Sequence, residues 1–462
     1  MKPDHLSENA IIDGYSLSVP GGPSRKIAIG WLLLALSSLV IGGLFTILIV
    51  LSRVPGTQDF FPWVDFFHTA LVVHVDLTVL VWFLSFAGLF WSLNSNGRCT
   101  RCGWVALYIA IAGTAIMTVS PFLGAGGPLM NNYVPVIRDP IFFTGLGVFG
   151  VGFTLLVLRG LAFSKPIGSG ISGAGTLKFA LYTALIIALL SVISIIISYT
   201  GMPAAFEGEG YYEILFWGGG HTIQFTHVQL MLMVWLWLAT VSGLHPRISP
   251  RIALFIFALG SLPALATIYV YYAFEVGSGM HILSFTWLMQ YGGGLAAVLI
   301  ALVIIPGFLK LEAAADDVRA KRSALFFSIL LFGIGGIIGF MISGSNTIIP
   351  AHYHASIFAV TMAFMGITYH LLPRLGFRTP TGKMVRWQPA IYAIGQMIHV
   401  FGLAWSGGHG VQRKTAGAAQ GLETMEKIVG MRVMGLGGLI AIIGGIIFLV
   451  IVFKAMWPNR KQ

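Results

Sequence analysis

The stretch from Ile348 to Gly376, IIPAHYHASIFAVTMAFMGITYHLLPRLG, decides how the rest of the chain is interpreted. It is apolar, long enough to cross a bilayer as a helix, and carries His352 and His354 near its start. In an α-helix, residues i and i+2 point about 200° apart, so the two imidazoles leave nearly opposite faces. Histidines inside a membrane segment usually mark a ligand, an ion path or a proton relay. The alternative is that both histidines only hydrogen-bond neighbouring helices, and this stretch alone does not decide.

The composition is that of a polytopic membrane protein. Of the 462 residues, 56% are hydrophobic and 9% are charged, and the mean hydropathy is +0.86. The net charge of +11 does not indicate nucleic-acid binding, because the basic residues are dispersed between apolar runs instead of forming a stripe. Two cysteines, Cys99 and Cys102, imply no disulfide framework, and their CTRC segment is at most half of a zinc site.

Twelve apolar segments are each long enough to cross a bilayer of about 30 Å, and they predict an all-α bundle of transmembrane helices. They lie at residues 27–51, 66–93, 103–125, 141–164, 176–199, 213–243, 251–275, 284–311, 322–343, 348–373, 387–407 and 430–456. Residues 1–26 are polar and lack the apolar core of a signal peptide, so we expect a cytoplasmic tail. Because no composition break follows, residues 27–462 are expected to form a single transmembrane domain.

The distribution of basic residues predicts the orientation of the chain. If both termini are cytoplasmic, 21 of the 27 Lys and Arg residues lie on the inner side. The other basic residues are Arg53, Arg138, Arg413, Lys414, Lys427 and Arg432. By the positive-inside rule, this asymmetry places both termini in the cytoplasm.

The predicted orientation gives the depth of each histidine. The second, sixth and tenth expected helices all enter from the outer side, and their outer thirds carry His74, His221, His352 and His354. Four imidazoles at one level, on three helices that run the same way, indicate metal or heme ligation, for which a neutral imidazole nitrogen is well suited. His399, in the eleventh expected helix, is most simply a buried histidine that its neighbours satisfy.

At these residues the chain resembles subunit I of the heme-copper oxidase superfamily, which includes terminal oxygen reductases and bacterial nitric oxide reductases. The AHYH segment is similar to the paired-histidine motif of the family, and HVDL from His74 is similar to its nitric oxide reductase version in helix 2. The resemblance implies that His352 is the axial ligand of a high-spin, substrate-binding heme. It implies that His74 and His354 clamp a low-spin heme, expected to be heme b, in a multi-pass protein embedded in the lipid of a bacterial cytoplasmic (inner) membrane.

Two further segments carry the resemblance. NNYVPVIRDP from Asn131 is similar to the outer segment between helices 3 and 4 of the family. Arg413 and Lys414, between helices 11 and 12, match the basic pair that resembles the clamp on the heme propionates. Adjacent cations at an interface suit paired carboxylates, and an ordinary solvated loop is the alternative.

The expected second metal site departs from the family, in which one histidine of helix 6 and a tandem histidine pair of helix 7 hold it. His221 matches the first, but the helix 7 segment ATIYVYYAFEVGSGMHI contains no tandem pair. Tyr271 and Tyr272 lie at the equivalent spacing, whereas a competing alignment puts Met280 and His281 there. Either the second metal is absent or an unusual copper or iron site forms. The residues that would complete it are Tyr271, Tyr272, His281 and Glu275.

Two other departures bear on the gas that is reduced. Phe225 stands four residues after the helix 6 histidine, where oxidases commonly have a redox tyrosine and nitric oxide reductases a glutamate. Helix 8 has no lysine in its apolar stretch and helix 6 has no carboxylate beyond Glu213, so no inner proton route is expected. These departures favour nitric oxide slightly over oxygen. Asp76, two residues from His74, is the only carboxylate well inside an expected helix.

The resemblance therefore implies a membrane oxidoreductase in which electrons from a periplasmic donor reach the low-spin heme, then the high-spin heme, and reduce a small gas, NO or O2. The chain has no CxxCH and no cupredoxin-like region, so a separate subunit with heme c or copper is expected as the donor. The alternatives are a cytochrome c oxidase proper and a non-catalytic heme protein that senses gas or transfers electrons. A transporter is the third, because twelve helices alone do not specify function.

Overall fold

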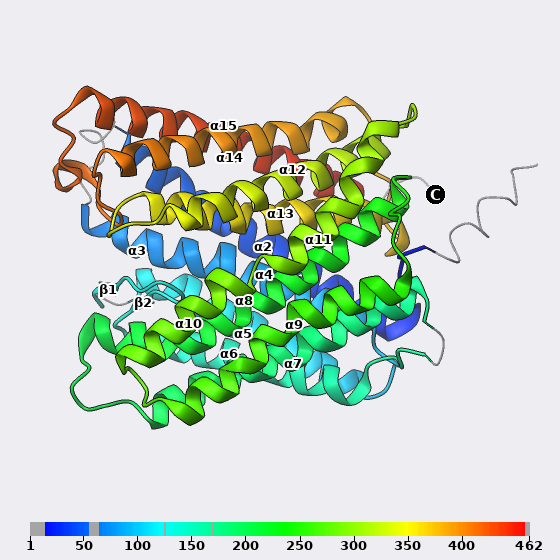
Figure 1. Cartoon of the computed structure of the whole chain (residues 1–462), viewed down its shortest axis with the longest axis horizontal. Helices are drawn as coiled ribbons and strands as arrows, with labels where there is room; N and C mark the ends of the chain where they lie inside the picture. Colours follow the sequence, from blue (N-terminus) through cyan, green and yellow to red (C-terminus); the bar gives the residue numbers. More distant parts are fainter. Residues whose placement is uncertain (1–13, 55–63, 124–125, 169–170, 458–462) are drawn as a thin grey trace, which may run out of the picture. The chain divides into compact units, whose positions relative to one another are not determined.

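The computed structural model describes residues 14–54, 64–123, 126–168 and 171–457, and these residues are almost entirely helical (Figure 1). The elements of the first part are α2 (Gly22–Arg53), α3 (Val64–Val75), the π-helical turn η2 (Asp76–Val81), α4 (Trp82–Leu93), α5 (Thr100–Val119), η3 (Ser120–Phe122), β1 (Pro128–Leu129), β2 (Val136–Ile137), α6 (Pro140–Phe163), α7 (Gly173–Thr200) and α8 (Gly208–Val241). They continue with α9 (Pro250–Ala273), α10 (Gly279–Gly292), α11 (Leu295–Ile304), η4 (Ile305–Lys310), α12 (Asp316–Phe340), α13 (Ile348–Arg374), α14 (Lys383–Gly408), η5 (Gly417–Gln420) and α15 (Met425–Met456). Half of the tail expected at 1–26, residues 1–13, lies outside the described residues.

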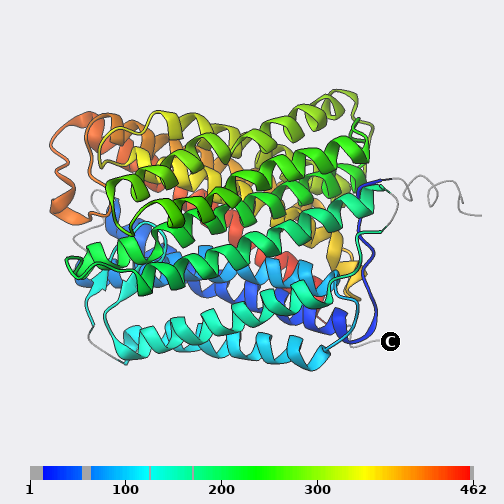
Figure 2. The same cartoon turned by 60° about the horizontal axis from the view of Figure 1, so that its bottom comes forward.

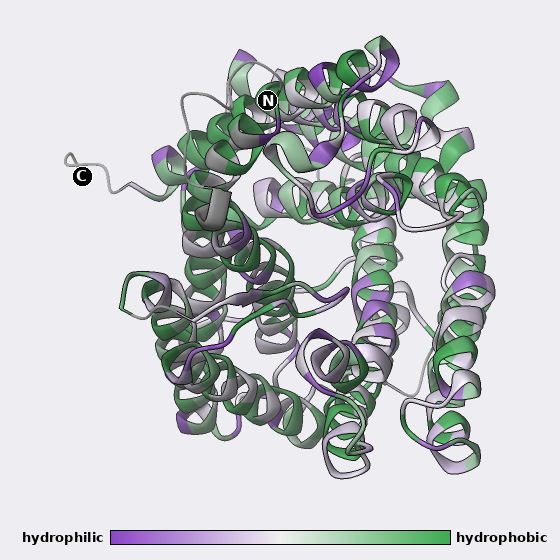
Figure 3. Ribbon diagram, turned by 90° about the vertical axis from the view of Figure 1, so that its left-hand side faces the viewer, coloured by the Kyte–Doolittle hydropathy of each residue, from purple (hydrophilic) through white to green (hydrophobic). Residues whose placement is uncertain are grey.

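Among the described residues, 11 helical segments are long and apolar enough to cross a membrane. One of them combines α3, η2 and α4, and another combines α10, α11 and η4. The span predicted at 387–407 corresponds to α14, a 26-residue helix that polar residues such as Gln388 and Gln396 make less apolar. Green and white predominate along the helices in Figure 3, and purple gathers in the connections and at helix ends. The predicted all-α fold of a polytopic membrane protein is confirmed.

Five predicted spans start at least five residues too late, because a criterion based on apolar runs ignores polar first turns and their caps. The span predicted at 284–311 begins at Gly279, where the Ser278 hydroxyl accepts a hydrogen bond from the amide of His281 at 3.2 Å. The span predicted at 430–456 begins at Met425, after the capping residue Thr424. The span predicted at 213–243 likewise begins at Gly208. Side-chain caps of this kind stabilise the first helical turn.

The chain divides into two compact units, each assembled from segments distant in sequence. Unit 1 is formed by Met1–Leu32, Phe86–Ala110 and Val151–Val318, and unit 2 by Leu33–Ser85, Ile111–Gly150 and Arg319–Gln462. In unit 1, α7, α8 and α9 run alongside one another, as both Figure 1 and Figure 2 show. The expectation of a single domain over residues 27–462 stays a prediction.

In unit 2, glycines bring the backbones of α14 and α15 into contact, and the two helices lie side by side in Figure 1. A Cβ atom at Gly402 would collide with the backbone of Met434, and one at Gly437 would collide with the backbone of His399. Small residues allow helices to approach closely where lipid surrounds them. The backbone at His399 is therefore held directly against α15.

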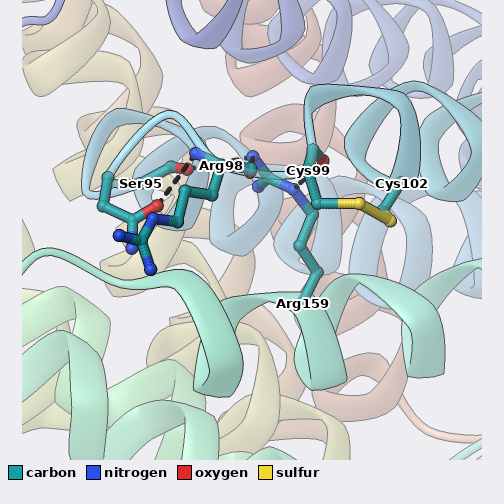
Figure 4. The surroundings of a disulfide bond; sticks show 6 residues. Ser95, Arg98, Cys99, Cys102 and Arg159 are labelled. Atoms are coloured by element: carbon teal, nitrogen blue, oxygen red, sulfur yellow. Dashed lines mark hydrogen bonds between the residues drawn. A yellow bond between two sulfur atoms is a disulfide. The ribbon is translucent and has the colours of Figure 1, made fainter.

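Cys99 and Cys102, at the start of α5, form a disulfide bond. This pairing was not predicted from the sequence, and the bond removes both cysteines as ligands for a zinc half-site. The Arg159 side chain of α6 reaches this turn (Figure 4) and donates hydrogen bonds to the carbonyl of Cys99 at 3.1 Å and the hydroxyl of Ser95 at 2.9 Å. The disulfide bond and the hydrogen bonds from Arg159 thus both stabilise this turn.

Candidate functional site

α13 places His352 in its first turns, beside α12. The Nδ1 atom of His352 donates a hydrogen bond to the carbonyl of Gly335 at 2.7 Å, so Nε2 is the nitrogen that is oriented for ligation. One turn further along α12, Gly339 lies against the same ring, since a Cβ atom there would come within 2.8 Å of Nδ1. The backbone of α12 therefore fixes both the tautomer and the position of this imidazole.

His74 lies near the end of α3 and is oriented by α2. Its Nδ1 atom is 3.1 Å from the carbonyl of Gly42 and 2.9 Å from the hydroxyl of Thr46, which in turn donates to Gly42 at 2.9 Å. The π-helical turn η2 begins two residues later, and the Thr78 hydroxyl donates to the His74 carbonyl at 2.7 Å. A π-helical turn inside a helix is frequent at functional sites. His74 thus shows the same arrangement as His352, with Nδ1 held and Nε2 oriented for a ligand.

His354, two residues after His352, lies next to a histidine of α14. The rings of His354 and His399 are 4.9 Å apart, centroid to centroid, with 48° between their planes. His399 donates from Nδ1 to the carbonyl of Met434 at 2.9 Å, whereas Nδ1 of His354 is buried and has no hydrogen-bond partner among the described residues. His74 lies within electrostatic range of both rings. The structure therefore brings a third imidazole, which the sequence analysis treated as ordinary core, to the predicted pair.

Arg53, at the end of α2, is a second residue whose role the sequence analysis missed, because it counted there only as an outer basic residue. Its Nε and Nη2 atoms are buried without a hydrogen-bond partner in the part of the chain that the structure describes. It lies within electrostatic range of Tyr353 and His354. A buried cation without a partner is costly, so this guanidinium fits an anionic group bound beside the histidines. The carboxylates of a heme match that requirement.

Arg413 contacts the segment that begins at Asn131, and Lys414 contacts the residue directly before it. Arg413 donates from Nη1 to Oδ1 of Asn132 at 2.7 Å, and Lys414 donates from Nζ to the carbonyl of Met130 at 3.1 Å. That segment is the turn between β1 and β2, an antiparallel pair of two-residue strands. The two stretches are thus joined within unit 2, and a role of the basic pair at heme propionates stays a prediction.

Unit 1 contains a separate group of side chains around Phe285 of α10. The centroid of its ring is 5.7 Å from that of His221, 5.6 Å from that of Tyr271 and 5.2 Å from that of His281. The Tyr271 hydroxyl is 2.7 Å from that of Ser198. Because α10 starts earlier than predicted, His281 lies in its first turn and is fully buried, so both competing alignments contribute one residue to this group.

These residues do not fit the second metal site of the resemblance. His221, whose Nδ1 donates to the carbonyl of Trp217 at 2.7 Å, and His281 are two imidazoles where that site has three, and the Phe285 ring packs against both. Both ring nitrogens of His281 are buried without a hydrogen-bond partner within the described residues. Tyr272 does not join the group, because its side chain is 89% exposed. The exposed residues Glu275 and Met280 do not join it either.

Phe225 of α8 lies in an apolar cluster. Its side chain is 2% exposed and packs with Ile187 and Ala264, against which Leu288 and Met289 also pack. No proton or electron donor is provided at this position. The Phe285 group contains a phenol instead from α9, that of Tyr271.

Comparisons with known proteins show the family and the fold of the chain. The family described as "Cytochrome C and Quinol oxidase polypeptide I" matches residues 26–447. An uncharacterised protein of Rickettsia prowazekii (strain Madrid E) is 27% identical over 94% of this chain and 96% of its own length. An uncharacterised protein of Aquifex aeolicus (strain VF5) is 30% identical over 78% of this chain and 88% of its own. The cryo-EM structure of a heme-copper terminal oxidase dimer superposes with a TM-score of 0.72 at 16% identity, and it covers 96% of this chain and 86% of the matched one.

Proposed function

Because the chain belongs to the family of cytochrome c and quinol oxidase polypeptide I, we propose that it is the heme-bearing subunit of a membrane oxidoreductase that reduces nitric oxide, with oxygen as the second candidate substrate. The observation that carries the proposal is the shared arrangement of His74 and His352. Each imidazole is held through Nδ1 by a carbonyl of a neighbouring helix, at 3.1 Å and 2.7 Å, which is the usual support of a metal-ligating histidine.

The resemblance suggests the cofactor roles, and these contacts support them. His352 would hold the high-spin heme, and His74 with His354 would hold the low-spin heme. The buried nitrogens of Arg53, which lack partners among the described residues, fit a heme carboxylate. Together with Arg413 and Lys414, this residue would complete the polar edge of the site.

A heme held by two imidazoles supplies one-electron transfer, and a heme held by one imidazole supplies an open face for a gas. The chain itself orients the Nε2 atoms of His74 and His352, because backbone carbonyls hold the Nδ1 atom of each ring. Reduction of two NO to N2O and water takes up two electrons and two protons. The phenol of Tyr271, bonded to the hydroxyl of Ser198 at 2.7 Å, is the proton-holding group that we assign to unit 1. No step is assigned to a second metal, because the residues around Phe285 do not provide its donor set.

Nitric oxide is preferred over oxygen because of two features. Phe225 is an apolar core residue, so the redox tyrosine common in oxidases is not provided there. Glu213 is the only carboxylate that the sequence offers along α8 after its first turn, so a proton route through this helix is not supported. The position of Tyr271 near His221 and His281 is what keeps oxygen as a candidate, because a phenol can come from α9.

We further propose that the chain lies in a bacterial cytoplasmic membrane with both termini in the cytoplasm, and that a separate subunit with heme c or copper donates electrons from the periplasmic side. The asymmetry of basic residues supports the orientation. Fusions of a reporter that is active only in the periplasm to the C-terminus and to the loop at Arg413 test it. Activity is expected from the loop fusion alone.

The decisive experiment is a reduced-minus-oxidised optical spectrum of the purified chain, with and without CO, followed by turnover of NO and O2 with an artificial electron donor. We expect one heme that binds CO, one that does not, and faster consumption of NO under anaerobic conditions. A protein without heme would refute the proposal. CO binding without turnover of either gas would instead favour a non-catalytic heme protein that senses gas or transfers electrons.

A further inference from the structure

His399 shares a feature with two histidines to which the proposed function assigns iron. Within the described residues, three histidines are held through Nδ1 by a backbone carbonyl of a neighbouring helix. They are His74 with Gly42 at 3.1 Å, His352 with Gly335 at 2.7 Å and His399 with Met434 at 2.9 Å. Such a bond fixes the tautomer in which Nε2 carries the lone pair available to a metal. His354, which the sequence motif points to, shows no such bond.

The imidazole of His399 lies beside that of His354, which the proposed function assigns to the low-spin heme. Its ring is 4.9 Å from that of His354, and both rings lie within electrostatic range of His74 and Arg53. The glycine at 438 makes room for it, because a Cβ atom there would approach Nδ1 of His399 to 3.2 Å. His399 is 8% exposed, so its imidazole is buried with these residues.

We propose that His399 is a second imidazole donor to the low-spin heme, able to bind iron opposite His74 in place of His354. The proposal rests on the proposed function, since it presupposes a heme at His74. If a heme is bound, exchange of His354 for His399 would break one Fe–N bond and form another. Because both ligands are neutral imidazoles, the exchange would need no electron, proton or further reactant. His399 would thus serve as a reserve ligand for this heme.

The alternative is that His399 only packs between α13 and α15. The two interpretations differ in what happens when His354 is removed. With a reserve ligand, the iron keeps two imidazoles and stays low-spin. With a packing role alone, the iron loses its sixth ligand, becomes high-spin and binds CO.

The test uses full-length protein with His354→Ala, His399→Ala and both changes together, and it measures the low-spin EPR signal and the CO-difference spectrum of each. His370→Ala is the matched control, because this histidine is also on α13 and is 3% exposed, and it lies near the other end of the helix. We expect both single variants and the control to keep most of the low-spin signal. Only the double variant is expected to lose it and to gain a second CO-binding heme.

Loss of the low-spin signal in His354→Ala alone, with heme still bound and the signal restored by added imidazole, would overturn the inference. Restoration by imidazole shows that the site is folded. If the alanine variant does not assemble, His354→Gln, which keeps a polar side chain of similar size, takes its place. A wild-type protein that binds no heme would refute the proposed function itself, whereas these variant spectra refute only the reserve ligand.

Discussion

The ring centroids of His354, on α13, and His399, on α14, are 4.9 Å apart within unit 2. The structure thus groups three histidines, His74, His354 and His399, where the sequence motif predicts a pair. The motif identifies His354 because this residue is only two positions from His352 in the sequence. The contact with α14 joins residues far apart in the chain, and it became visible only when the helices were packed.

The imidazole of His352 is expected to be sensitive to a single methyl group on α12. In Gly339→Ala, the new Cβ atom would lie 2.8 Å from Nδ1 and 2.9 Å from Cε1, so the ring must move from its bond with Gly335. Disturbing the support of a metal-ligating histidine typically costs about 10- to 100-fold in affinity. We expect CO binding and gas turnover to fall accordingly, as measured by CO titration.

Gly336→Ala is the matched control for that substitution. It lies on the same helix, and a Cβ atom there meets nothing within 4 Å in the described structure. Both changes raise intrinsic helix propensity by about 1 kcal/mol, so a difference between them reports the contact with His352. Equal CO binding by the two variants would contradict the assigned contact between Gly339 and His352.

Thr46 is expected to tune the low-spin heme without being needed for its retention. In Thr46→Val, His74 loses the hydroxyl at 2.9 Å but keeps the carbonyl of Gly42 at 3.1 Å. The midpoint potential of the low-spin heme should shift, while its heme content stays unchanged. Redox titration measures the shift, and Ser38→Ala, on the same helix with a hydroxyl that donates to Ala35, is the control. A potential identical in all three proteins would argue against His74 as a ligand.

Arg53→Gln should lower the affinity of the protein for heme. If the buried guanidinium binds a heme carboxylate, its loss removes a charge-assisted hydrogen bond of about 1.5–3 kcal/mol. This corresponds to roughly 10- to 100-fold faster heme transfer to apomyoglobin. Arg432→Gln, an exposed basic residue of α15, should transfer heme at the wild-type rate. Equal rates of heme transfer in the two variants would show that Arg53 does not bind the heme carboxylate.

The group around Phe285 lacks one donor for a three-imidazole site, so Phe285→His is expected to create it. The ring at this position lies 5.7 Å from His221 and 5.2 Å from His281, centroid to centroid. Three neutral imidazoles suit copper or zinc. Elemental analysis after dialysis against copper should show more bound metal in this variant than in wild type or in Phe285→Leu. Equal copper content in all three would show that the side chains cannot converge.

Replacing both Cys99 and Cys102 by serine should lower stability and leave heme content and turnover unchanged. Loop-closure entropy for so short a loop predicts a loss of roughly 2 kcal/mol. Thermal unfolding followed by heme absorbance measures it, and wild-type protein treated with a reductant should show the same loss. Thiol labelling in whole cells adds a test of orientation, because disulfides are rare on the cytoplasmic side where the sequence predicts this loop.

The sequence predicted the spans and the histidine motif because both are local patterns. Apolar length identified the helices, although caps such as Ser278 moved their starts and thereby placed His281 in the first turn of α10, beside Phe285. The sequence did not identify Arg53 or His399 as residues near the predicted ligands. An arginine at a helix end and a single histidine in an apolar helix have the same sequence pattern whether or not they contact a functional site. Their roles depend on packing between α2, α13 and α14.

The turn η2 (Asp76–Val81) has a consequence for how this chain is compared with others. A π-helical turn accommodates an additional residue, so every side chain of α4 is rotated by about 100° from the direction that uninterrupted winding would give it. Deleting one residue between 76 and 81 would restore regular winding and aim either His74 or the whole of α4 at the wrong neighbours. An alignment that crosses this turn without a gap would therefore pair residues that face different partners, even where both helices have the same length.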